Sequence, residues 1–150
     1  PLKRGFHNHR FCAQARDIQP AWTWGRLYDL RAGFPALEVP NHLILAHGSD
    51  RPLHDARLQT KSPPFPVGKP EGDWDWVSGE LVTLGNPEAD LPPIDRLEGF
   101  QANGRRNLYD RVLVHVWTAT ASGVAWTYDG AKLRAEGIRC GFWPVNPRFR

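Results

Sequence analysis

The stretch RVLVHVW, residues 111–117, decides the fold class. Valines at alternate positions give this segment one apolar face, and Leu113, His115 and Trp117 make up the other face. A period of two in β-branched and aromatic residues predicts a β-strand, and apolar residues on both faces predict burial from both sides. Residues 123–128 follow after a short turn and are predicted to be the antiparallel partner of this strand in a hairpin.

Two further strands and one short helix are predicted on the N-terminal side of the hairpin. Aromatic residues alternate through residues 21–30 and apolar residues gather in residues 77–84, so both segments are typical of strands. Residues 90–99, DLPPIDRLEG, predict a short helix because three apolar residues fall on one side. Its prolines suit a first turn, and Gly99 is placed to end it.

The remaining segments give no clear periodicity. Residues 42–76 include SPPFP at 62–66 and predict a long inserted loop outside the core. Residues 138–150 are aromatic and rich in proline, and they predict a loop packed over the sheet. The sum is one α+β domain over residues 1–150, with a curled mixed sheet or a small mixed β-barrel and short flanking helices.

The composition excludes several classes of protein. The 150 residues include 14 glycines and 14 prolines, which argues against a bundle of long helices. The formal net charge of +3 comes from scattered basic residues, so we expect no nucleic-acid partner. No apolar run is long enough for a membrane span or a signal peptide. Cys12 and Cys140 are expected to be reduced thiols in a cytoplasmic protein.

Glu98 is the candidate catalytic residue that the pattern itself indicates. It closes the predicted helix, where the helix dipole places partial negative charge, and it lies beside Leu97 and Phe100. Both features disfavour the ionised carboxylate and should raise its pKa toward the range of a general base. The alternative is a surface carboxylate paired with Arg105 or Arg106.

The segment IDRLEGF at 94–100, followed by NLYDRVLVHV at 107–116, resembles the hallmark of the γ-glutamylcyclotransferase-like family. In that family a (L/I)D-x-x-EG-aromatic segment precedes a Y-x-R-x-x-V-x-V strand. Other segments are similar to family motifs in the same order, and together they cover about residues 2–143. They are LKRG at 2–5, WGRLYDL at 24–30, GFPA at 33–36, VSGEL at 77–81, AWTY at 125–128 and CGFW at 140–143.

The resemblance implies a small mixed barrel with flanking helices and a cavity at one end. It also implies an enzyme that needs no cofactor and releases 5-oxoproline from a small-molecule γ-glutamyl substrate. Glutathione, γ-glutamyl dipeptides and γ-glutamylamines all carry the required γ-glutamyl group. The family pattern assigns the role of general acid and base to Glu98.

The resemblance further implies how the substrate is held. Backbone N–H groups of the first family loop receive the substrate α-carboxylate, and the matching residues are Pro1, Leu2, Lys3 and Gly5. Tyr109 matches a family tyrosine whose hydroxyl could hold the substrate or Glu98, although packing at the head of a strand explains it equally well. Phe34 and Pro35 could form a wall of the pocket, or simply a turn.

The N-terminal segment departs from the family pattern. The family's first strand, which runs into Tyr-Gly, is missing from this sequence, and Pro1 stands in place of a Thr or Ser. Proline has no N–H to offer a carboxylate. The absence of methionine suggests that residues precede Pro1 in the natural protein.

Other interpretations remain open at this point. A non-enzymatic module that binds a small molecule or a partner on the same barrel is the main alternative. The HNH triplet at 7–9 permits a metal or nuclease site, which the lack of accompanying ligand spacing disfavours. His42, His47 and His54 are interpreted as polar loop residues. The strip DWDW at 73–76 is either a lid or docking strip, or simply the end of the insertion.

Overall fold

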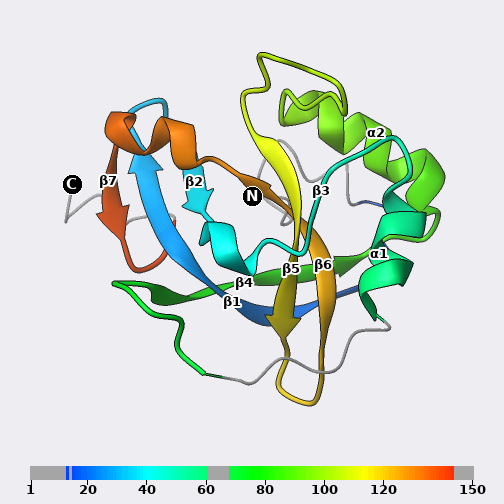
Figure 1. Ribbon diagram of the computed structural model, residues 1–150, viewed down its shortest axis with the longest axis horizontal. Helices are drawn as coiled ribbons and strands as arrows, with labels where there is room; N and C mark the ends of the chain where they lie inside the picture. Colours follow the sequence, from blue (N-terminus) through cyan, green and yellow to red (C-terminus); the bar gives the residue numbers. More distant parts are fainter. Residues whose placement is uncertain (1–12, 14, 61–67, 144–150) are drawn as a thin grey trace.

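Four strands close a mixed β-barrel in the computed structural model, which describes residues 13, 15–60 and 68–143 (Figure 1). Each barrel strand pairs with its neighbour, and the last strand returns to the first. The pairing of β2 with β6 is parallel and the other three are antiparallel, so the expected mixed barrel is confirmed. In barrel order the strands are β1 (Asp17–Leu30), β2 (Pro35–Glu38), β6 (Ser122–Asp129) and β5 (Asp110–Trp117).

Three further pairings lie outside the closed barrel. The strand β3 (Ala46–His47) pairs with β5, while β4 (Asp75–Thr83) pairs with the first half of β1. The strand β7 (Gly137–Cys140) pairs with the last four residues of β1. Because β1 is 14 residues long, it can pair with its two neighbours in the barrel and also with β4 and β7.

The predicted hairpin at the centre of the fold is confirmed. Strands β5 and β6 pair in antiparallel register from Asp110↔Asp129 to Trp117↔Ser122. Residues 111–114 are all buried, as the apolar faces of the segment indicate. Val112 and Val114 form a core cluster with Val39, and a second cluster joins Leu30, Ala36 and Tyr109.

Short helices cover the barrel. The α-helices α1 (Pro52–Thr60) and α2 (Pro87–Leu97) lie near each other at the right of Figure 1. The 3₁₀ helix η2 (Asn41–Leu43) follows β2, and η3 (Ala131–Glu136) leads into β7. Within the described part of the chain, no helix is both long enough and apolar enough to cross a membrane.

Helix α2 starts earlier than its sequence suggested. Asn86 caps it, since its side-chain oxygen accepts a hydrogen bond from the Ala89 N–H, and Pro87 occupies the first helical position. The prediction that Pro92 and Pro93 lie in the first turn is therefore wrong, because both lie inside the helix. Burial of the apolar face compensates for the hydrogen bonds that these prolines cannot donate.

Two predicted loops are also corrected. The expected loop at 42–76 contains β3 and α1, and the expected loop at 138–150 begins with β7. A two-residue strand shows no alternation, and α1 has no buried residue that would create an apolar face. Neither element therefore leaves the periodic signal from which sequence predictions are made.

Candidate active site

The end of helix α2 fixes the position of Glu98. Glu98 is the last residue with helical geometry, and its N–H donates to the Ile94 carbonyl at 2.9 Å. Gly99 follows with a φ of +66°, its N–H donates to Arg96, and the Phe100 N–H donates to the Asp95 carbonyl at 2.8 Å. This pair of bonds is the Schellman motif that ends many helices at a glycine. The predicted stop at Gly99 is confirmed.

Replacing Gly99 with alanine should disturb this helix end. Alanine disfavours a positive φ, and its Cβ would lie 2.9 Å from the Leu108 Cβ. We expect a loss of about 1–3 kcal/mol in the free energy of unfolding, measured by urea denaturation. Gly123→Ala is the matched control, since nothing lies within 4 Å of its added Cβ. Equal stability of the two variants would contradict the strain at Gly99.

Two tyrosines lie close enough to Glu98 for its charge to raise their pKa values. The Tyr109 N–H donates to the Glu98 carbonyl at 3.3 Å, which ties the end of α2 to the start of β5. Burial and the nearby charge of Glu98 raise the pKa of Tyr109 to about 12. Burial is also the main reason that the pKa of Tyr128 is raised, with Asp95 and, more weakly, Glu98 acting in the same direction. Both phenols are therefore neutral at physiological pH.

Glu98 itself is half-buried, and burial raises its pKa. Among the described residues, its carboxylate has no hydrogen-bond donor and no ion-pair partner, so neither Arg105 nor Arg106 neutralises it. Glu38, Asp95 and Asp129, by contrast, each accept a hydrogen bond from another residue. Of these four carboxylates, Glu98 is the one that accepts no hydrogen bond from a described residue.

A large apolar cavity lies between the barrel strands and the two α-helices. Its volume is about 680 Å³, and its walls include Leu91 and Ile94 of α2, Tyr128 and Pro35. Glu98 does not itself line this cavity. It follows Ile94 by four residues and Leu91 by seven, so it lies on the helix face that looks onto the cavity. Its charge is close enough to act on Tyr128, which does line the cavity.

The structure brings three of the predicted site residues together. The Tyr109 hydroxyl donates to the Pro35 carbonyl at 2.8 Å, and Tyr109 is 5% exposed. Its hydroxyl therefore supports the turn at Pro35 and does not bond to Glu98. Phe34, in the same turn, is 38% exposed and does not line the cavity. Pro1, Leu2, Lys3 and Gly5 lie outside the described residues.

A buried ion pair behind the site was not identified from the sequence. Asp95 accepts a hydrogen bond from the Tyr128 hydroxyl at 2.6 Å and forms an ion pair with Arg111, which is 2% exposed. The Arg111 guanidinium also donates to the Ser49 carbonyl at 2.5 Å and lies between the rings of Phe100 and Trp126. The sequence signal was present, because Asp95 and Arg111 both belong to the hallmark motif.

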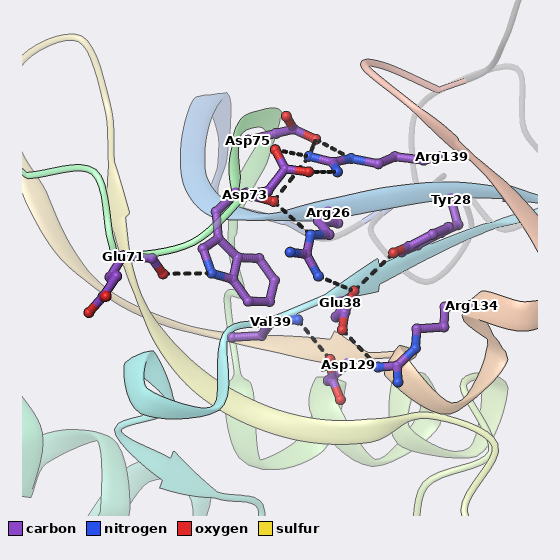
Figure 2. Close-up of polar contacts among 11 residues, drawn as sticks. Arg26, Tyr28, Glu38, Val39, Glu71, Asp73, Asp75, Asp129, Arg134 and Arg139 are labelled. Atoms are coloured by element: carbon purple, nitrogen blue, oxygen red, sulfur yellow. Dashed lines mark hydrogen bonds and ion pairs between the residues drawn. The ribbon is translucent and has the colours of Figure 1, made fainter.

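A second network of hydrogen bonds and ion pairs surrounds Glu38 of β2, which is 6% exposed (Figure 2). Its carboxylate accepts hydrogen bonds from Arg134 at 2.8 Å and from the Tyr28 hydroxyl at 3.0 Å, and Arg26 lies 3.5 Å away. Because all of these partners belong to the chain, this carboxylate joins β1, β2 and η3 and is not free for chemistry.

The strip at 73–76 is held against the barrel next to this network. Arg26 lies 4.0 Å above the Trp74 ring, and Arg139 of β7 bonds to both Asp73 and Asp75 (Figure 2). The hydrogen bond from Arg139 lowers the pKa of Asp73. These contacts hold the start of β4 and the two residues before it against β1 and β7.

The histidines do not form one group. His42 lies in η2, His47 in β3 and His54 in α1, while the triplet at 7–9 lies outside the described residues. No set of three or more His, Cys, Asp or Glu side chains in the described part of the chain could hold a metal ion. Cys140 is a free thiol in β7, and Cys12 lies outside the described residues.

Comparisons with protein-family models, with curated proteins and with solved structures found no match to this chain.

Proposed function

We propose that this chain is a γ-glutamylcyclotransferase-like enzyme that releases 5-oxoproline from a γ-glutamyl amino acid, peptide or amine. The observation that supports it most is Glu98, a half-buried carboxyl group with a raised pKa and no partner among the described residues. Leu91 and Ile94, seven and four residues before it on the same helix, line an apolar cavity large enough for a γ-glutamyl compound. The resemblance of residues 94–116 to the family hallmark points to the same residue.

The proposed reaction is an intramolecular aminolysis. The substrate's α-nitrogen attacks its own γ-carbonyl carbon, a new C–N bond closes a five-membered lactam, and the C–N bond to the departing amine breaks. The Glu98 carboxylate accepts a proton from the attacking nitrogen and returns it to the departing nitrogen, so no proton is consumed. The γ-carbonyl oxygen stays in the lactam, and water contributes no atom.

The site suits this chemistry for two physical reasons. The nucleophile is already tethered to the carbon it attacks, so the protein has only to hold the reacting conformer and move one proton. Because its pKa is raised, the Glu98 carboxylate takes up a proton near neutral pH more readily than an exposed glutamate does. Tyr109 and Tyr128 contribute by fixing the surroundings of the carboxyl group.

A panel of substrates tests the proposal. The chain is incubated with glutathione, a γ-glutamyl dipeptide and a γ-glutamylamine, and 5-oxoproline is measured by mass spectrometry. We expect 5-oxoproline and the free leaving group in equal amounts from at least one compound. Saturable binding of these compounds without product would favour the alternative, a non-enzymatic binding module on the same barrel.

The burial of Glu98 predicts how stability depends on pH. Because its pKa is raised in the folded state, the folded chain binds this proton more tightly than the unfolded chain. The ionised carboxylate is therefore destabilising above the folded pKa, and this penalty disappears as the pH falls through it. Glu98→Gln should raise the melting temperature at about pH 8 and leave it unchanged at about pH 4. A variant that is less stable than the wild type at the higher pH would contradict the burial effect.

A further inference from the structure

A second cavity lies toward the far end of β5 from Glu98. Its volume is about 600 Å³, and its walls include Trp24, His115 and Trp117 from the strands and Leu43 and Leu45 from the segment after β2. Tyr109 and His115 are six positions apart, which corresponds to about 20 Å of extended chain. This cavity is therefore separate from the candidate active site.

Tilted aromatic rings form one wall of this cavity. The ring of Trp117 lies 5.9 Å from that of His115 and 5.1 Å from that of Trp76, with the planes inclined at 36° and 48°. Trp76, which does not itself line the cavity, lies 4.7 Å from Trp24, at 56°. Burial lowers the pKa of His115, so its ring is neutral and the wall carries no charge. Rings inclined in this way suit contact with another aromatic ring.

The rim of the cavity carries one charge of each sign. Lys69 and Glu71 both line it and are both exposed. Neither makes an ion pair with another residue that the structure describes. Figure 2 shows the Glu71 carboxylate turned away from the network around Arg26. An ammonium and a carboxylate two residues apart complement a ligand group that carries both charges.

We propose that this cavity binds an aromatic α-amino acid. The aromatic side chain lies against Trp24 and Trp117, the α-carboxylate pairs with Lys69, and the α-ammonium pairs with Glu71. A ligand with a ring and no charges would use neither rim charge, and a polyanion would be repelled by Glu71. The volume of the cavity is within the range typical of small-molecule sites.

Isothermal titration calorimetry with three related probes tests this site. L-Phenylalanine carries both charges, 3-phenylpropanoate lacks the ammonium, and phenethylamine lacks the carboxylate. We expect saturable binding of L-phenylalanine, and binding of each single-charge analogue at least about fivefold weaker. No saturation with L-phenylalanine up to about 10 mM, or equal affinity for all three probes, would overturn the proposal.

Substitutions of the two exposed rim residues test which charge of the ligand each of them binds. Lys69→Met should weaken L-phenylalanine and 3-phenylpropanoate about fivefold and leave phenethylamine unchanged. Glu71→Gln should weaken L-phenylalanine and phenethylamine and leave 3-phenylpropanoate unchanged. If both variants alter all probes alike, or alter none, the assignment of the rim is wrong.

A cavity-filling variant locates the ligand. Leu43→Trp should abolish binding of L-phenylalanine without lowering the melting temperature by more than a few degrees. Retained binding in this variant would place the ligand elsewhere and overturn the proposal. Glu98→Gln is the matched control and should bind all three probes as the wild type does. Because the assay needs no turnover, its outcome is independent of the proposed activity.

Discussion

Replacing Glu98 with glutamine should lower the rate of 5-oxoproline release by about 10²–10⁴-fold, the usual contribution of a general acid or base. Glutamine keeps the size of the side chain and cannot exchange a proton. Because the carboxylate has no partner among the described residues, the substitution breaks no ion pair there, and the fold should survive. The readout is kcat from initial rates of 5-oxoproline formation.

The control is Glu88→Gln, which makes the same change of charge on the same helix at an exposed position. It should turn over like the wild type. The wild-type kcat/KM should also fall as the pH is lowered and Glu98 becomes protonated. This fall should begin at a higher pH than for an exposed glutamate, because the pKa of Glu98 is raised. A folded Glu98→Gln variant with undiminished turnover would remove Glu98 from the mechanism and leave the barrel assignment untouched.

Replacing Arg111 with methionine should have the largest effect on stability. Arg111 is almost fully buried and neutralises Asp95, so its loss leaves a carboxylate without its counter-charge. Breaking a buried ion pair in this way costs about 3–5 kcal/mol in the free energy of unfolding. Urea denaturation followed by tryptophan fluorescence measures the loss.

Two further variants keep this prediction testable if the single variant does not fold. The double variant Arg111→Met with Asp95→Asn removes both charges and should recover part of the lost stability. Tyr128→Phe removes one hydrogen bond to Asp95 and should cost about 1–3 kcal/mol. If Arg111→Met unfolds at the same urea concentration as the wild type, the pair is not a stabilising contact.

The parts of the fold that the sequence predicted correctly are those with a local repeating pattern. Residues 111–117 alternate so regularly that both the strand and its burial follow, and Gly99 ends α2 because few other residues adopt its backbone angle. Strand β3 and helix α1 lack such a pattern. They are held by contacts with β5 and β6 that lie far away in the sequence, which local spacing cannot reveal.

The same distinction applies to the candidate site. Glu98 could be identified because its chemistry depends on the helix end and apolar neighbours next to it in the sequence. Two other contacts could not, since Arg134 is 96 positions from its partner Glu38 and Ser49 is 62 positions from its partner Arg111. In the sequence, a buried charged residue cannot be distinguished from an exposed one, because its partner is distant along the chain.

The most direct test of the proposed reaction uses water labelled with ¹⁸O. The chain is given a γ-glutamyl amino acid in labelled water, and the products are weighed by mass spectrometry beside those of Glu98→Gln. Attack by the substrate's own nitrogen predicts unlabelled 5-oxoproline, one free amino acid for each lactam, and far less of both from the variant. Glutamate carrying ¹⁸O in its γ-carboxylate, or 5-oxoproline formed equally fast by the variant, would contradict it.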